Sequence, residues 1–301
     1  MNEHIDHDET MRFNLSESYS LMAQFDDCIM KLADEGEGLS LGFPEIEQVL
    51  DSRGYQGGQF IVILAKPKVG KTFLVCNSIG HLMREGKKVL FISIEMNSST
   101  IIPRLLRLEF QCGYDELKQK AIFEPEMIAE VGNRWKNKLF LMDMKEVNLG
   151  LINNFVKSFS PDVIFIDYLQ LVVDKTSQNE IEKVSKVAKG LADLAQIHDK
   201  IVIALSQTAK EDSPGWKMPS SSSGKWSSDI HIAADVLIGM CRPDTDPDCS
   251  HGDKGKVILQ ILESRYGGSS IATPYKYDPL TTKLMHYDKW VAEGSRFGEA
   301  R

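Results

Sequence analysis

From residue 59 onward, the chain alternates short, uninterrupted apolar runs with longer amphipathic stretches. The apolar runs that predict strands are Phe60–Ala65, Val89–Ile94, Lys138–Met142, Val163–Asp167 and Ile201–Leu205. Continuous apolar strands separated by helical segments are typical of a parallel sheet that is covered by helices on both faces. The sequence therefore predicts an α/β domain with a mostly parallel central sheet.

Further along, the pattern becomes denser in strands, with turn residues between them. The additional runs that predict strands are Asp235–Met240, Lys256–Leu262, Ser270–Tyr277 and Lys283–His286. We expect these strands to be antiparallel additions at one edge of the sheet. Between the two groups, Thr208–Ser228 is too long and too polar for a routine connection, which indicates a mobile functional loop.

Ahead of the sheet, apolar residues recur every three to four positions over Leu15–Ala33 and predict one amphipathic helix. Such a helix must bury its apolar stripe either on its own domain or on a neighbouring subunit, and the sequence leaves both alternatives open. We expect three parts: an acidic arm with this helix in residues 1–36, the α/β domain in 37–290 and a C-terminal tail in 291–301.

Composition narrows the class of protein. The formal net charge of −8 argues against a uniformly basic nucleic-acid coat, but not against a channel lined by a few lysines where several subunits meet. The five cysteines include no CxxC pair, and no long uncharged apolar stretch follows the acidic N-terminus. The sequence therefore predicts no signal peptide and no membrane span, and we expect a cytoplasmic protein without a membrane partner.

A candidate phosphate-binding loop lies between the first predicted strand and the helix after it. It reads Ala65-Lys66-Pro67-Lys68-Val69-Gly70-Lys71-Thr72, followed by Phe73. In this context, backbone N–H groups and the helix N-terminus face the phosphates, the lysine reaches the β and γ oxygens, and the threonine hydroxyl binds Mg²⁺. We expect residues 66–73 to bind ATP, with Lys71 also acting in catalysis and Thr72 as a metal ligand. A chance Gly-Lys-Thr in a strand-to-helix turn is the alternative.

Three other predicted strands deliver polar residues to the same edge of the sheet, where parallel α/β folds bind ligands. Asp167 would bind the nucleotide's Mg²⁺ through water, Glu95 would polarise the attacking water, and Gln207 would sense the γ-phosphate. The alternatives are a turn-forming aspartate and a glutamate that caps the next helix. Because these groups follow separate strands, the pattern favours ATP hydrolysis, with ATP and Mg²⁺ as cofactors.

These motifs together resemble the DnaB family of replicative DNA helicases. The resemblance rests on five segments in the family's order, namely Gly38–Pro44, Ala65–Thr72, Ser93–Met96, Asp167–Leu171 and Leu205–Gln207. It extends over about Leu15 to Tyr287 and implies the family's RecA-like P-loop NTPase motor domain, preceded by its linker helix. Fewer than forty residues precede Leu39, so we expect the family's N-terminal collar domain to be absent, as in a phage or mobile-element helicase.

The resemblance also implies residue roles outside the phosphate-binding loop. In the family an arginine reaches across to the γ-phosphate of the neighbouring subunit, and Arg265 matches that position. A surface arginine in a glycine-rich hairpin is the alternative. Glu263 stands where the family usually has a lysine. The candidates for DNA contact are Lys210, Lys217 and Lys225 in the long loop, and a solvated linker is the alternative there.

The resemblance implies a homo-oligomeric ring, a hexamer, that hydrolyses ATP between subunits and moves along single-stranded DNA in the 5′ to 3′ direction. A primase, a loader or a separate collar protein would be a further partner. Two alternatives stay open: a RecA-like ATPase that remodels or loads replication proteins without unwinding, and a nucleotide-binding ring component without catalytic activity.

Overall fold

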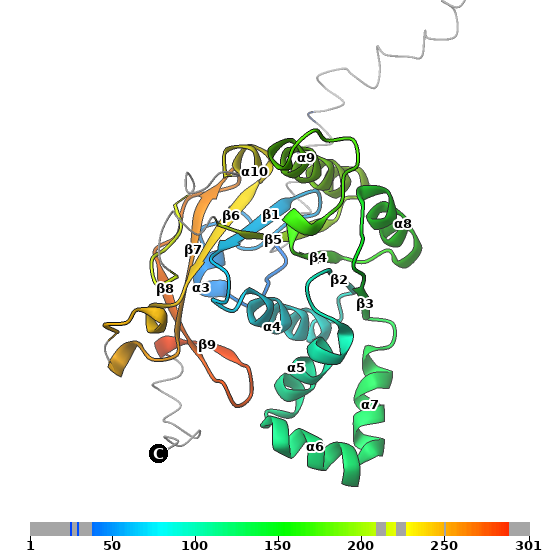
Figure 1. The fold of residues 1–301 in the computed structure, drawn as a ribbon, viewed down its shortest axis with the longest axis vertical. Helices are drawn as coiled ribbons and strands as arrows, with labels where there is room; N and C mark the ends of the chain where they lie inside the picture. The colour runs from blue at the N-terminus through cyan, green and yellow to red at the C-terminus, as the bar shows by residue number, and fades with distance from the viewer. Residues whose placement is uncertain are drawn as a thin grey trace, which may run out of the picture. The chain divides into compact units, whose positions relative to one another are not determined.

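The computed structural model describes residues 25, 29, 38–208, 215–220, 227–249 and 251–288, and element numbers follow Figure 1. The chain divides into two compact units, Met1–Gly38 and Leu39–Arg301. In the first unit Phe25 and Ile29 are described, and both are helical and exposed. The rest of the helix predicted at Leu15–Ala33 lies outside the described residues, as does the tail predicted at 291–301.

The described part of the second unit is built on one nine-stranded sheet with the order β3-β2-β4-β5-β1-β6-β7-β8-β9 (Figure 1). The strands are β1 (Phe60–Ala65), β2 (Val89–Ser93), β3 (Leu139–Asp143), β4 (Val163–Asp167), β5 (Ile201–Gln207), β6 (Val236–Cys241), β7 (Lys256–Ser264), β8 (Thr273–Tyr277) and β9 (Leu284–His286). Strands β1 to β6 pair in parallel, whereas β7, β8 and β9 are added antiparallel at one edge. The predicted mostly parallel sheet with antiparallel edge strands is confirmed.

The prediction that Asp235–Met240 is an antiparallel addition was wrong, because β6 pairs in parallel with β1. The connection from β5 to β6 contains a short helix, α10 (Ser227–Ala233), which packs against α9 (Glu180–His198) on one face of the sheet. A crossover through a helix brings the chain back to the end of the sheet where it started, so the next strand runs parallel. The polar run of serines before α10 concealed this helix in the sequence.

Helices cover both faces of the sheet, as the sequence predicts. The remaining helices are α3 (Pro44–Glu47), α4 (Lys71–Arg84), α5 (Ser98–Phe110), α6 (Tyr114–Phe123), α7 (Pro125–Trp135) and α8 (Leu149–Phe159), with single 3₁₀ turns at Leu169–Leu171, Pro243–Thr245 and His251–Asp253. Along β1, Ile61 and Ile63 face the core beneath α3, α4 and α5, whereas Phe60 and Val62 face the core beneath α8, α9 and α10. The alternation of side chains along a strand thus produces two separate cores.

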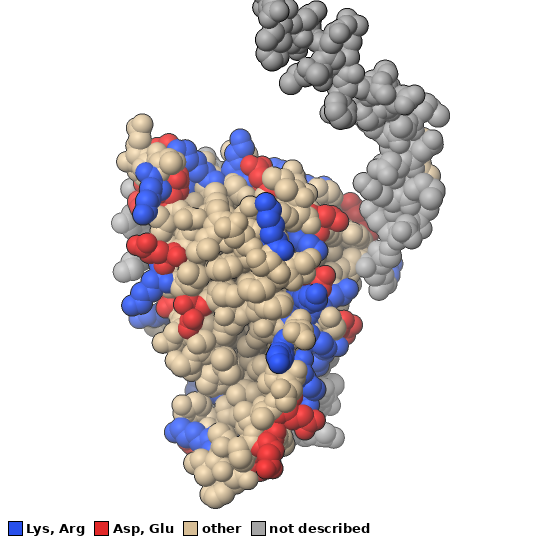
Figure 2. Space-filling model, turned by 90° about the vertical axis from the view of Figure 1, so that its right-hand side faces the viewer, with Lys and Arg blue, Asp and Glu red and all other residues tan. Residues whose placement is uncertain are grey.

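Helices α6 and α7 continue from α5 and lie beyond the covered part of the sheet (Figure 1). Their end, at the bottom of Figure 2, has a mainly uncharged tip. Ile122 is 71% exposed and Phe123 is 78% exposed there. None of the described helices is long and apolar enough to cross a membrane.

The register of the parallel strands fixes where the motifs meet. Ala65 at the end of β1 pairs with Gln207 at the end of β5, and Ser93 at the end of β2 pairs with Asp167 at the end of β4. The polar residues that the sequence places at strand ends therefore gather at one edge of the sheet.

Candidate nucleotide-binding site

The loop between β1 and α4 has the backbone geometry of a phosphate cradle. Gly70 precedes α4 with a left-handed φ of 102°, and Lys68 also has a positive φ of 66°. Glycine adopts this region without steric cost, which explains the residue type at position 70. Among the described residues, no side chain caps the first turn of α4, so its N–H groups can receive an anion.

The ammonium group of Lys71 is buried inside this loop. Its Nζ donates hydrogen bonds to the carbonyl oxygens of Ala65 and Lys66, both at 3.1 Å. Burial lowers the pKa of Lys71 to about 8, against the opposing effect of the nearby carboxylates of Asp167 and Glu95. A cation held by neutral carbonyls and away from water is stabilised by an incoming phosphate, which fits a nucleotide.

Thr72 and Asp167 form the oxygen-rich side of the pocket. The Thr72 hydroxyl donates to Oδ2 of Asp167 at 2.8 Å. Burial raises the pKa of Asp167 to about 6, and the hydrogen bond from Thr72 works in the opposite direction. A hydroxyl and a carboxylate beside a phosphate cradle are the hard oxygen ligands that Mg²⁺ prefers, so this pair fits the cofactor.

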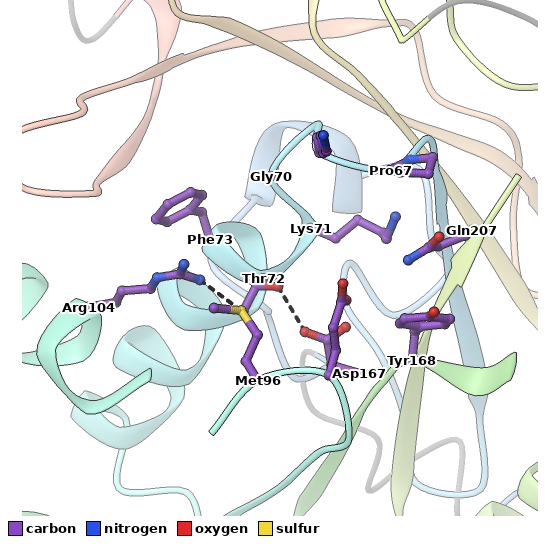
Figure 3. Close-up of a pocket in the computed structure, with 12 residues that line it drawn as sticks. Pro67, Gly70, Lys71, Thr72, Phe73, Met96, Arg104, Asp167, Tyr168 and Gln207 are labelled. Carbon is purple, nitrogen blue, oxygen red and sulfur yellow. Dashed lines mark hydrogen bonds between the residues drawn. The ribbon is translucent and has the colours of Figure 1, made fainter. Parts of the chain in front are cut away.

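The groups surround a pocket of about 430 Å³ (Figure 3). It is lined by Pro67, Lys68, Gly70, Lys71, Thr72, Phe73, Glu95, Met96, Arg104, Asp167, Tyr168 and Gln207. Arg104 and Phe73 lie on one side, and Tyr168 and Gln207 lie on the other (Figure 3). The structure thus brings together the predicted residues from four strand ends.

Arg104 is a pocket residue that sequence reasoning missed. It lies in α5, its guanidinium stands 4.5 Å from the centre of the Phe73 ring, and Nη1 donates to the Met96 sulfur at 3.4 Å. Its charge opposes the rise that burial causes in the pKa of Asp167. An arginine in mid-helix carries no motif, and the packing of α5 against α4 is what brings it to the phosphate-binding loop.

Gln170 supports the pocket from behind. Its Nε2 donates to the Ser206 hydroxyl at 2.9 Å and to the Gln207 carbonyl at 3.2 Å. These bonds tie the residues after β4 to the end of β5 and hold Gln207 at the rim. Gln170 belongs to a motif seen in the sequence, but the residues alone assigned it no role.

The other predicted site residues lie outside the pocket lining. The Val69 side chain is buried in the core, and Lys66 contributes its carbonyl oxygen to Lys71. Lys217 is exposed, with Nζ 4.8 Å from the centre of the Trp216 ring. Lys210 and Lys225 lie outside the described residues.

Arg265 lies at the N-terminal end of the parallel strands, whereas the pocket lies at their C-terminal end. Its backbone N–H donates to the Asp235 carbonyl at 2.9 Å, and the Asp235 N–H donates to the Phe60 carbonyl at 2.8 Å. Phe60 begins β1, whereas the phosphate-binding loop follows the other end of that strand. The chain's own Arg265 and its own pocket are therefore separated by the whole length of β1.

Comparison with known proteins places most of the chain within a family model. Residues 38–281 match the DnaB-like helicase C terminal domain. A probable plasmid replicative DNA helicase of Chlamydia muridarum is 31% identical over 261 residues, covering 82% of this chain and 55% of that protein. The replicative DNA helicase DnaB of Geobacillus stearothermophilus is 24% identical over 294 residues, covering 93% and 63%. The chain thus spans little more than half the length of these relatives.

Two solved structures have the same fold. A solved ATPase domain superposes with a TM-score of 0.75 at 21% identity, over 90% of this chain and 98% of that one. A structure described as a DnaB-like replicative helicase and its interactions with primase gives a TM-score of 0.74 at 21% identity, over 88% of this chain and 66% of that one. The predicted RecA-like fold is confirmed by these matches.

Proposed function

The chain belongs to the DnaB-like helicase C-terminal domain family, and from this premise we propose that it is an ATP-driven DNA helicase motor. In this proposal identical subunits form a hexameric ring, ATP is hydrolysed between subunits, and the ring moves 5′ to 3′ along single-stranded DNA. The relatives named replicative DNA helicases support the helicase class.

The observation that carries the proposal is the separation of Arg265 from its own pocket. β1 spans six residues, or about 20 Å at the usual rise of a strand. An arginine side chain is much shorter than this, so Arg265 can reach a phosphate only in a second copy of the chain. An arginine supplied by a neighbour stabilises the charge of the transition state and is worth roughly 10³ to 10⁵ in rate.

Within one pocket the proposed roles follow from the contacts. The phosphate-binding loop and Lys71 would hold the phosphates, and Thr72 and Asp167 would hold Mg²⁺, which when bound neutralises charge on the phosphate oxygens. Glu95 is exposed at the rim and would accept a proton from the attacking water. Gln207, held by Gln170, would donate a hydrogen bond to the γ-phosphate.

Glu263, which replaces the family's usual lysine, has a partner within its own subunit. Its carboxylate is paired with the His231 ring in α10. This pairing turns the Glu263 carboxylate toward α10 of its own subunit, so it need not repel a nucleotide.

For DNA we propose Lys210, Lys217 and Lys225 as backbone contacts, one loop per subunit. Support comes from the described part of the loop, residues 215–220, which packs against the phosphate-binding loop. A Cβ added at Gly215 would lie 3.2 Å from Val69 Cγ1, so the two loops are in direct contact. We also propose a primase, a loader or a separate collar protein as a partner, since one structural relative is described together with its interactions with primase.

The test is the steady-state ATPase rate against protein concentration, with and without single-stranded DNA, for the wild type, Lys71→Ala and Arg265→Ala. We expect a cooperative rise with concentration, stimulation by DNA and loss of activity in both variants. A rate indifferent to concentration and to Arg265 would contradict hydrolysis between subunits. DNA-stimulated hydrolysis without strand displacement would instead favour a remodelling ATPase.

A further inference from the structure

Asp235 is a buried carboxylate at the N-terminal end of the parallel strands, and the nucleotide pocket lies at their other end. It is 4% exposed and immediately precedes β6. Its Oδ2 accepts the backbone N–H of Phe60 at 2.9 Å, and its own backbone bonds both to Phe60 and to Arg265. The carboxylate is therefore fixed in place by the ends of β1, β6 and β7.

The guanidinium of Arg265 rests on this carboxylate. Nη1 donates to Oδ1 of Asp235 at 3.2 Å, and Nη2 donates to the carbonyl oxygen of Ile232 in α10. The Arg265 side chain is nevertheless 54% exposed. Because a guanidinium has five N–H donors in a rigid fork, these two bonds leave further donors without an acceptor among the described residues, and the exposed side chain can present them to a partner.

Two roles for Asp235 are conceivable: a restraint that must release the arginine, or a support that stays bound while the arginine acts. Releasing the guanidinium would leave the buried Asp235 charge with the Phe60 N–H but without its cation, which is strongly unfavourable. The second role keeps the pair intact and uses the exposed donors of the fork. The burial of Asp235 therefore favours the support.

We propose that Asp235 is a positioning residue that holds Arg265 in the orientation needed to meet the phosphate of a neighbouring copy. The proposal rests on the proposed function, because it assumes that Arg265 acts on a second subunit. It assigns Asp235 to the subunit that donates the arginine, and it predicts no role for Asp235 in the subunit whose pocket is occupied. Preorganised donors of this kind stabilise a transition state without reorganisation at the moment of reaction.

The experiment separates these two subunit roles by mixing variants. Lys71→Ala chains keep Arg265 but lack a working pocket, and Arg265→Ala chains keep the pocket but lack the arginine. Each is inactive alone under the proposed function, and mixing them should restore ATPase activity at mixed interfaces. Asp235→Asn, which keeps an acceptor for the Phe60 N–H, is then added either to the Lys71→Ala donor or to the Arg265→Ala acceptor.

We expect Asp235→Asn in the donor to lower the restored kcat by about ten-fold or more, with KM for ATP unchanged, because orientation of a catalytic group acts on the transition state. In the acceptor it should leave the restored rate unchanged. Equal restoration by Lys71→Ala donors with and without Asp235→Asn would overturn the inference. Equal losses with Asp235→Asn in the donor and in the acceptor would also overturn it, because a folding defect acts in both subunits alike. If Lys71→Ala and Arg265→Ala fail to restore activity at all while the wild type hydrolyses ATP, the proposed function itself is wrong.

Discussion

At the scale of single residues, the pocket holds two ionisable groups whose pKa values are moved toward each other by burial. Lys71 has its pKa lowered to about 8, and Asp167 has its pKa raised to about 6. Under the proposed function, nucleotide binding would need Lys71 charged for the phosphates and Asp167 ionised for Mg²⁺. Both conditions are met together only between these two pKa values.

We therefore expect the affinity for MgATP to rise with pH through about 6, as Asp167 loses its proton, and to fall above about 8, as Lys71 loses its charge. Titration of a fluorescent ATP analogue with Mg²⁺ over a pH range that spans both pKa values measures this profile. Thr72→Val removes a hydrogen bond that lowers the pKa of Asp167, so the acid limb should move to higher pH. An acid limb that stays in place in this variant would contradict the assignment.

Arg104 offers a second prediction at this scale. Its guanidinium lies beside Phe73 and Met96 and adds positive charge at the pocket wall, so Arg104→Met should weaken nucleotide binding by about ten-fold. Arg107→Met is the matched control, since Arg107 lies on the same helix but donates to the carbonyls of Pro279 and Leu280. Isothermal titration calorimetry with MgATP measures the affinity of both variants and of the wild type. Similar losses of affinity in both would mean that α5 affects the pocket only through its packing.

Sequence reasoning found the residues at the strand ends because position along a parallel strand determines which edge a residue occupies. Glu95, Asp167 and Gln207 were predictable in this way, Lys71 was predictable from the phosphate-binding motif, and all four line one pocket. Arg104 was not predictable, because it reaches the pocket through the packing of two helices. Contacts of that kind leave no local pattern in a single sequence.

At the scale of elements, the turn after β7 depends on Gly267. It has a φ of 122° and forms an isolated bridge with Leu50. A Cβ added there would lie 2.3 Å from the Val49 carbonyl oxygen, so a side chain would meet both backbone strain and a steric clash.

We expect Gly267→Ala to lower the free energy of unfolding by about 2–4 kcal/mol, as judged by urea denaturation. Gly268→Ala is the matched control, because a Cβ at that position meets no heavy atom of the described residues within 4 Å. It should change the free energy of unfolding by less than about 1 kcal/mol. Comparable destabilisation by the two variants would argue that the turn does not require this geometry.

The strands were predictable and the direction of one of them was not. Apolar runs bounded by turn residues mark strands, so each of the nine predicted runs overlaps an observed strand. The orientation of β6 depends on α10, a seven-residue helix that follows a run of serines and has too few turns to produce a clear apolar period. Direction is set by the connection, and a short helix in a polar connection is hard to recognise.

At the scale of the whole molecule, the end of α6 and α7 exposes Ile122 and Phe123. Exposed apolar side chains of this size are stabilised when another surface covers them, and the proposed ring provides such surfaces.

We expect the double substitution Ile122→Ser and Phe123→Ser to weaken self-association by about ten-fold without lowering the free energy of unfolding, because both side chains are already exposed. Sedimentation velocity over a range of concentrations measures the association. Ile197→Ser is the control, since Ile197 is 76% exposed at the end of α9, on another part of the unit. A loss of association with the control alone would move the interface to α9.

The distance between Arg265 and its own pocket also limits the geometry of any assembly. In the proposed assembly, the surface at one end of the parallel strands would give an arginine and the surface at the other end would accept one. Two copies would then use unlike surfaces, and the contact would be heterologous rather than two-fold symmetric. A dimer built this way leaves one arginine and one pocket unused. Addition of subunits continues until the rotation between neighbours closes a circle, or else it extends into a helical filament. Activity per subunit should therefore depend on closure, because only a closed assembly has no unmatched ends.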